Sequence, residues 1–166
     1  MFANRLANVR IAMDENGIDA LLLSVGADLP YFTGYEAMPL ERLTMLVLPR
    51  EGQAKLIVPA LEAPRVREHP DIFTLLPWKE SEDPISMLVD ELAGVASVAV
   101  GDTTWTRFTI ELLNQLPNLR LSRANTITSP IRSIKSPDEI GRLQKAASAV
   151  DRIASRLQNG EIQLIG

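Results

Sequence analysis

The sequence predicts an α/β domain with three layers around a mixed sheet, followed by a long C-terminal helix. Apolar runs of strand length alternate with helical stripes along most of the 166 residues. Two neighbouring runs are joined by a turn typical of an antiparallel hairpin, and a strongly capped helix begins at Ser136. A chain of this length is sufficient for one core and an appendage.

The composition is that of a globular protein and excludes several classes of function. Apolar residues make up 46% of the chain and charged residues 23%, and the formal net charge is -4. No dense cluster of Lys and Arg offers a surface for phosphates, and no apolar run approaches the roughly 20 residues of a membrane span. Residues 1–10 also lack the plan of a signal peptide. We therefore expect a cytoplasmic protein that binds neither nucleic acid nor membrane.

The chain contains no cysteine and a single histidine, His69. This excludes disulfides and thiolate chemistry and removes most ligand sets for transition metals. His69 stands in a turn-like Glu-His-Pro-Asp stretch, so we expect an exposed loop histidine without a metal-binding or catalytic role.

The first half of the chain predicts a helix, a buried strand and a hairpin. Apolar residues at helical spacing indicate a helix over residues 2–13, and Gly17 ends it because glycine adopts the left-handed conformation without a steric penalty. Residues 18–25 form an apolar run of strand length, and residues 26–39 predict a structured loop or a short helical turn. An antiparallel hairpin is predicted from two apolar runs joined by a Pro-Arg-Glu-Gly turn, residues 43–48 and 54–58.

The second half alternates between helical and strand patterns, which indicates further crossover connections in the sheet. The predicted elements are a short helix at residues 61–68, a strand at 72–76 ended by Pro77, a helix from Asp83 to Gly94, a strand at 95–100, a helix at 106–116 and a strand at 119–121.

The strongest local signal is the start of the C-terminal helix. Ser136 and Glu139 form a capping box around Pro137, which favours the first helical position. The helix is expected to run for about 22 residues and about 33 Å, longer than one face of a small sheet. We therefore expect part of its stripe to lack a partner in this chain and to mediate self-association, and we interpret the apolar end at Ile162, Leu164 and Ile165 as a truncation.

Three segments resemble the creatinase/prolidase/Xaa-Pro aminopeptidase family. The first helix followed by Gly-Ile-Asp-Ala-Leu-Leu-Leu-Ser at residues 17–24 is similar to the family's first helix and strand, and residues 30–35, Pro-Tyr-Phe-Thr-Gly-Tyr, are similar to its Thr-Gly-aromatic loop. Residues 131–140, with Leu143 and Ala146 beyond them, resemble the junction at which the family's catalytic domain begins. Asp28 and Phe32 depart from the asparagine and leucine that are common in the family.

The resemblance implies a creatinase N-terminal-like, ribonuclease H-like fold with a mixed sheet of about six strands. It implies that residues 1–133 are the N-terminal domain and that residues 134–166 are a linker and the first helix of a catalytic pita-bread domain. In the family that domain holds two divalent metals, manganese or cobalt, through Asp, Asp, His, Glu and Glu ligands. None of those positions lies in this chain, so we expect neither metal ligands nor catalytic residues here and no hydrolysis by the chain alone.

The resemblance also suggests two candidate substrate contacts, Arg42 and Tyr35, reaching across a dimer into a neighbouring active site. A guanidinium can bind a carboxylate with two hydrogen bonds, and an aromatic ring can cover a proline. The simpler alternative is that Arg42 is a solvated residue and that Tyr35 packs on its loop. Pairing of Arg42 with Glu36 or Glu41 would weaken the substrate hypothesis.

Other patterns favour structural roles. The acidic residues Glu80, Glu82 and Asp83 precede a helix, where negative charge is favourable. The loop at residues 101–104 lacks the glycine spacing and lysine of a phosphate loop. Trp78 and Trp105 are interpreted as core or interface anchors.

Three functions remain open at this point. The first is a non-catalytic domain of an Xaa-Pro dipeptidase or aminopeptidase that contributes dimerisation and substrate gating, with its own catalytic domain, a second copy and a peptide substrate as partners. The second is the same domain of a creatine amidinohydrolase or related C–N hydrolase. The third is a binding module for peptides or proteins whose parent has lost its metal ligands.

Overall fold

The computed structural model describes residues 2–162 of the chain. The chain divides into two compact units, residues 1–131 and residues 132–166, and the division falls within helix α5 (Asn125–Ser133). The assignment of the second unit to a catalytic domain stays a prediction. Leu164 and Ile165, which close the apolar end of the sequence, lie outside the described residues.

Unit 1 is built around a mixed, six-stranded sheet with the order β4-β3-β2-β1-β5-β6. The central strand β1 pairs antiparallel with β2 and parallel with β5. Strands β2 and β3 form the predicted antiparallel hairpin, while β3–β4 and β5–β6 are parallel pairs. The strands are β1 (Ala20–Ser24), β2 (Met45–Pro49), β3 (Ala54–Pro59), β4 (Phe73–Trp78), β5 (Ser97–Val100) and β6 (Arg120–Arg123).

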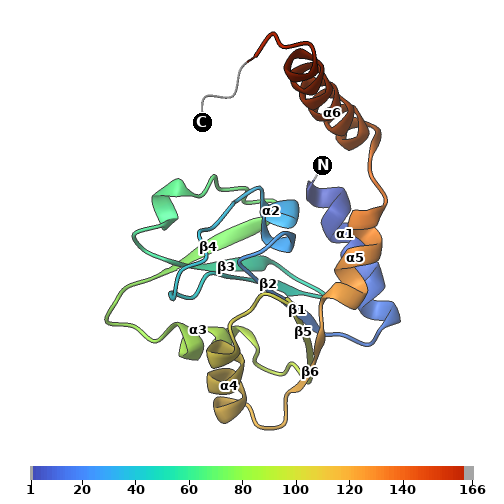
Figure 1. Cartoon of the computed structure of the whole chain (residues 1–166). Coiled ribbons are helices and arrows are strands. Elements are labelled where there is room, and N and C mark those ends of the chain that lie inside the picture. Colours follow the sequence, from blue (N-terminus) through green and yellow to red (C-terminus); the bar gives the residue numbers. More distant parts are fainter. Residues whose placement is uncertain (1, 163–166) are drawn as a thin grey trace. The chain divides into compact units, whose positions relative to one another are not determined.

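Helices cover both faces of the sheet, which confirms the predicted three-layer α/β architecture (Figure 1). One face carries α1 (Phe2–Glu15), α2 (Asp28–Thr33) and α5, and the other carries α3 (Pro84–Glu91) and α4 (Thr106–Gln115).

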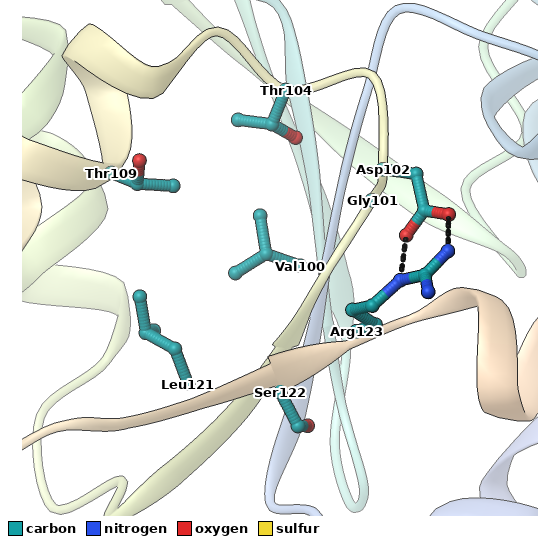
Figure 2. A pocket seen from close by; sticks show the side chains of 8 residues that line it. All are labelled: Val100, Gly101, Asp102, Thr104, Thr109, Leu121, Ser122 and Arg123. Atoms are coloured by element: carbon teal, nitrogen blue, oxygen red, sulfur yellow. Dashed lines mark hydrogen bonds and ion pairs between the residues drawn. The ribbon is translucent and has the colours of Figure 1, made fainter.

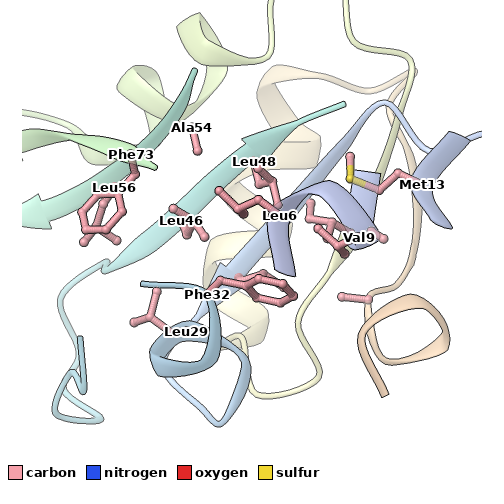
Figure 3. Packing of buried hydrophobic residues seen from close by; sticks show 14 of the residues in the cluster. Leu6, Val9, Met13, Leu29, Phe32, Leu46, Leu48, Ala54, Leu56 and Phe73 are labelled. Atoms are coloured by element: carbon pink, nitrogen blue, oxygen red, sulfur yellow. The ribbon is translucent and has the colours of Figure 1, made fainter. Parts of the chain in front are cut away.

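The side chains of β1 divide the core into two clusters. All five residues of β1 are buried, and successive side chains point to opposite faces of the sheet. Leu21 and Leu23 join the cluster under α1 and α2, whereas Ala20 and Leu22 join the cluster under α3 and α4. Figure 3 shows how side chains of α1 and α2 pack onto β2, β3 and β4 in the first cluster.

Several local predictions are confirmed. Helix α1 buries Leu6, Val9 and Met13 on one face, and Gly17 has a φ of 63° where the chain turns toward β1. Asp83 caps α3 by accepting hydrogen bonds from the backbone N–H groups of Ile85 and Ser86.

The prediction of a helix at residues 61–68 is wrong. This segment contains only the 3-10 turn η1 (Ala63–Arg65), and Val66 is already extended. His69 precedes Pro70, a position that disfavours the helical conformation, and the chain then turns at residues 70–72, where the N–H groups of Ile72 and Phe73 donate to the His69 carbonyl.

Pro77 does not end its strand, since β4 continues to Trp78. The backbone nitrogen of proline carries no hydrogen to donate to a neighbouring strand. Strand β4, however, lies at the edge of the sheet and pairs on one side only. The proline therefore interrupts no second ladder and protects this edge from further pairing.

His69 is half-buried rather than exposed. Its ring lies 5.4 Å from that of Phe2 and 6.3 Å from that of Phe73, measured between centroids. The apolar body of the imidazole thus contributes to packing beneath the start of α1.

Helix α5 was not predicted, because its threonines and the internal Pro130 give it a low intrinsic helix propensity. Tertiary contacts hold it instead: Ile127 and Thr128 are buried, and Thr128 Oγ1 donates a 2.9 Å hydrogen bond to Asp28 Oδ2 in α2. This contact gives a structural role to Asp28, one of the departures from the family pattern.

Unit 2 contains the predicted long helix α6 (Pro137–Gln158) of 22 residues. Its N-terminus has the complete capping box: Glu139 N–H donates to Ser136 Oγ, and Ser136 N–H donates to Glu139 Oε2 at 2.8 Å. Among residues 2–162, none of the helices combines the length and apolar content that a membrane span requires.

Asp19 connects three strands at the start of β1. Its Oδ2 accepts hydrogen bonds from Ala96 N–H at 3.1 Å and Ser97 N–H at 3.0 Å, and Ser97 Oγ lies 3.0 Å away. Arg50, at the end of β2, lies 3.5 Å from Oδ1 and donates its backbone N–H to the Asp19 carbonyl. Burial alone would raise the pKa of Asp19, but these hydrogen bonds and Arg50 hold that pKa below its ordinary value.

We predict that Asp19→Asn lowers the free energy of unfolding by about 1–3 kcal/mol at neutral pH, because an amide cannot accept all of these bonds. The native pKa is depressed, so the unfolded state binds more protons in acid, and the contribution of Asp19 is lost as the pH falls below about 4. Urea unfolding at neutral pH and at pH about 3 should therefore give a smaller difference between the two proteins in acid. Asp71→Asn at an exposed turn is the control, and an equal loss from both variants would contradict the role of Asp19.

Candidate functional site

The structure brings Tyr35 and Arg42 to one pocket. The segment between α2 and β2 carries both residues, and the end of β3 closes the opposite wall. The lining residues are Tyr35, Ala37, Met38, Leu40, Arg42, Thr44, Pro59 and Glu62. The enclosed space of about 10 Å³ is sufficient for one water molecule and too small for a peptide side chain.

Tyr35 is positioned by the end of α2. Gly34 ends that helix with a φ of 75°, a conformation that favours glycine. Thr33 Oγ1 accepts a 3.0 Å hydrogen bond from Tyr35 N–H and donates to the Leu29 carbonyl at 2.7 Å. The Thr-Gly-aromatic sequence therefore sets the direction in which the tyrosine ring leaves the helix.

The ring of Tyr35 is buried and its hydroxyl faces a carboxylate. Tyr35 Oη donates a 3.4 Å hydrogen bond to Glu62 Oε2, which also accepts from Arg65 Nη1 at 2.8 Å. Burial raises the pKa of Tyr35, the negative charge of Glu62 raises it further, and Arg65 acts in the opposite direction. Glu62 was not singled out from the sequence, because it follows Tyr35 by 27 residues with no motif between them.

Arg42 has a different acidic partner from those considered in the sequence. Its Nη2 lies 3.1 Å from Glu80 Oε1, so within residues 2–162 the partner is Glu80 rather than Glu36 or Glu41. The arginine side chain is 35% exposed and that of Glu80 63%, so solvent screens the pair and its contribution to stability is small. A ligand carboxylate could therefore replace Glu80 at low cost.

Arg42 also lines an open hollow of about 300 Å³ on the α3 and α4 side, together with Trp78, Phe108 and Arg107. Trp78 is buried here and its Nε1–H donates a 2.9 Å hydrogen bond to the Leu43 carbonyl, which confirms it as a core anchor. Arg42 thus lines both the small pocket of Tyr35 and the open hollow.

The acidic cluster before α3 serves several structural purposes. Asp83 caps the helix, and its pKa is lowered mainly by the hydrogen bond from Ser86 against the opposing effect of burial. Glu82 Oε2 accepts the Lys79 N–H at 2.6 Å, and Glu80 pairs with Arg42. The helix-start role is confirmed for Asp83 alone.

Large apolar side chains surround the pocket of Tyr35 and Arg42 on the outside. Met38 and Leu40 line it while remaining 52% and 39% exposed, and Leu61, next to Glu62, is 70% exposed. We call Met38, Leu40 and Leu61 the apolar rim. Exposed apolar groups gathered around one site are typical of surfaces that meet another protein.

A second hollow, of about 570 Å³, lies at the carboxyl ends of β5 and β6 (Figure 2). Arg123 binds Asp102 there through two hydrogen bonds of 3.1 and 2.5 Å, and the bond from Arg123 lowers the pKa of Asp102. The hydroxyl of Thr104 is buried and has no hydrogen-bond partner in the described part of the chain. The guanidinium of Arg123 is thus paired with Asp102 through two hydrogen bonds.

Trp105 is not a core anchor, and its alternative role as an interface anchor stays a prediction. It is 44% exposed and stacks on Phe108 with a centroid distance of 6.4 Å. It therefore covers the start of α4 from outside rather than filling the core.

We predict that Glu62→Gln lowers the pKa of Tyr35. The substitution removes the negative charge that disfavours the phenolate and leaves Arg65, which favours it. Spectrophotometric titration in a Tyr31→Phe background isolates Tyr35, since the chain has two tyrosines. Glu36→Gln in the same background is the control, and an unchanged titration in Glu62→Gln would contradict the contact.

Comparison with known proteins places the chain in a family. The model of the Creatinase/Prolidase N-terminal domain matches residues 5–134. A probable dipeptidase PepE of Mycobacterium tuberculosis is 30% identical over 161 residues, which cover 95% of this chain and 43% of that protein.

Two solved structures extend the similarity to the fold. A prolidase from Thermococcus sibiricus has a TM-score of 0.89 and 25% identity, with coverage of 100% of this chain and 46% of that one. The dipeptidase PepE of Mycobacterium ulcerans has a TM-score of 0.82 and 31% identity, with coverage of 93% and 43%.

The chain spans less than half of the length of each of these three proteins. The matched residues 5–134 contain the whole mixed sheet. They also contain the Thr-Gly-aromatic segment that positions Tyr35. The family model, the relatives and the solved structures thus agree with the resemblance to the creatinase/prolidase family that the sequence showed. The chain belongs to the Creatinase/Prolidase N-terminal domain family.

Proposed function

We propose that this chain acts as the non-catalytic N-terminal domain of a metal-dependent Xaa-Pro dipeptidase or aminopeptidase, where it contributes dimerisation and substrate gating. Family membership and the dipeptidase and prolidase names of the relatives support a peptide substrate over creatine. In this role the chain is inactive alone, and its catalytic domain, a second copy and a peptide substrate are its partners. We place the protein in the cytoplasm.

The observation that carries the gating role is the position of Arg42. The residue lines an open hollow, and its guanidinium pairs with the solvent-screened carboxylate of Glu80. A free substrate carboxylate would offer the same two oxygen acceptors as Glu80 and would gain strength where a neighbouring protein excludes water. Tyr35, the second candidate contact, lines the same small pocket as Arg42, and its hydroxyl donates a hydrogen bond to Glu62.

The apolar rim supports a protein surface opposite this arginine. Met38, Leu40 and Leu61 expose large side chains around the pocket. Burial of such side chains at an interface is favourable by roughly 25 cal/mol per Å² of apolar surface, before the cost of association. A neighbouring subunit seated here would bring its active site to Arg42.

The described residues do not fit the two-metal site implied by the family. Within residues 2–162, no three His, Asp or Glu side chains lie close enough together to hold a metal ion. In the proposed function, manganese or cobalt is held by the catalytic domain, and this chain positions the substrate.

We predict that the purified chain does not hydrolyse Xaa-Pro dipeptides when manganese or cobalt is added, because residues 2–162 bring no three His, Asp or Glu side chains together to hold a metal ion that could activate water. Product release should equal that of a sample treated with a chelator. Turnover that co-purifies with the chain, depends on metal and survives removal of contaminating peptidases would overturn the non-catalytic role.

We predict that Arg42→Ala, made in the full-length protein, raises KM for an Xaa-Pro dipeptide about tenfold or more with little change in kcat, because binding through the carboxylate is lost. The matching dipeptide amide lacks that carboxylate, so its KM should change little. Arg42→Lys should recover part of the affinity, since lysine keeps the charge but not the paired donors.

Arg120→Ala on the exposed strand β6 serves as the control and should leave both substrates unaffected. Equal effects of Arg42→Ala on the acid and the amide would contradict carboxylate binding. The DNA sequence beyond residue 166 provides a further check, since five metal ligands at family spacing are expected for a hydrolase, and their absence would favour the binding module.

A further inference from the structure

Arg42 and Glu80 are held near each other by the fold as well as by their own contact. Trp78 Nε1–H donates a 2.9 Å hydrogen bond to the Leu43 carbonyl, which ties the end of β4 to the segment that enters β2. Arg42 stands one residue before Leu43, and Glu80 stands two residues after Trp78. The two charged side chains therefore leave neighbouring stretches of backbone, and each meets the other at a high effective concentration.

The contact between these two side chains is weak by its geometry. It joins Arg42 Nη2 to Glu80 Oε1 at 3.1 Å. Arg123, by contrast, holds Asp102 through two hydrogen bonds, from Nε and from Nη2. Guanidinium–carboxylate pairs that use two donors are the stronger ones. Because the Glu80 side chain is 63% exposed, water competes for both partners and the pair opens readily.

The turn that carries Glu80 is shaped by the residues around it. Glu82 Oε2 accepts the Lys79 N–H at 2.6 Å, and Asp83 caps α3. Among residues 2–162, Arg42 is the side chain with which Glu80 pairs. The carboxylate of Glu80 therefore acts on Arg42 rather than on the turn.

We propose that Glu80 is a built-in competitor for the guanidinium of Arg42, which sets how strongly the protein distinguishes a free substrate carboxylate from an amide. This inference rests on the proposed binding of substrate by Arg42. The substrate carboxylate and that of Glu80 need the same donors and repel each other, so binding of one disfavours binding of the other. Molecules in which Glu80 occupies Arg42 are less able to bind substrate, which raises the apparent KM.

A positioning role for Glu80 fits the structure less well. Hydrogen bonds already fix the backbone that follows Arg42. The Leu43 carbonyl accepts from the indole at the end of β4, and the Thr44 carbonyl accepts from Ser24 Oγ at 3.0 Å. The two roles predict opposite effects when the charge of Glu80 is removed, since loss of a competitor lowers KM and loss of a positioning group raises it.

Steady-state kinetics of the full-length protein test the competition through Glu80→Gln. Exposed ion pairs of this kind leave about one half to one sixth of the guanidinium free. We therefore expect KM for an Xaa-Pro dipeptide to fall about two- to sixfold with little change in kcat. KM for the matching dipeptide amide should stay constant, so the ratio of the amide KM to the acid KM should rise by the same factor.

Glu41→Gln is the matched control. Glu41 lines the same open hollow as Arg42 and Glu80, so its substitution removes one negative charge from this surface and leaves the ion pair in place. We expect its KM values to change much less than those of Glu80→Gln. Both variants should keep the thermal unfolding midpoint of the unmodified protein, because both side chains lie at the surface.

An Arg42→Ala background separates this inference from the proposed function. Glu80→Gln should have no effect there, because the group for which it competes is gone. If Arg42→Ala raises KM for the dipeptide but Glu80→Gln alone leaves KM unchanged or raises it, the competition is overturned and substrate binding by Arg42 stands. An unchanged KM in Arg42→Ala would overturn both. A decrease in KM that persists without Arg42, or that Glu41→Gln reproduces, would also contradict direct competition.

Discussion

The fold depends on the way in which β1 is held between two neighbours of opposite direction. On one side β1 pairs antiparallel with β2, and on the other it pairs parallel with β5. All of its residues are buried, so a shift of one position would exchange its two faces and disrupt both core clusters. Asp19 fixes the register at one end of β1. Its carboxylate accepts hydrogen bonds from the backbone at the start of β5 and forms an ion pair with Arg50 at the end of β2.

This register determines where the candidate site lies. Beyond β1 the chain forms α2, whose end at Thr33 and Gly34 directs Tyr35 under the loop that returns to β2. Arg42 stands just before β2, close to the end of β3 from which Glu62 follows. The antiparallel arrangement of β1, β2 and β3 therefore gathers an aromatic ring, a cation and a carboxylate from three positions in the chain.

The two units use apolar surface differently. In unit 1 both faces of the sheet are covered, and the exposed apolar groups are confined to small areas such as the apolar rim. In unit 2 a single helix carries its whole stripe exposed. Helix α6 thus carries apolar surface that residues 132–162 do not cover.

Patterns within one element were predictable from the sequence because their causes are local. Periodicity identified α1, the hairpin and the strands, and capping chemistry located the starts of α3 and α6 to the residue. The three-layer fold followed from the order of these elements and the family from three short segments. By itself, the sequence thus determined the fold class and the start of the terminal helix, and it named Tyr35 and Arg42 as candidate contacts.

Only the tertiary structure decided which distant groups meet. Helix α5 forms against its own propensity because Ile127 and Thr128 are buried, and Pro77 is tolerated because β4 has a free edge. Glu80 rather than a sequence neighbour pairs with Arg42, and Glu62 faces Tyr35 across 27 residues. Such contacts arise from the packing of separate elements, and no periodicity or spacing in a single segment records them.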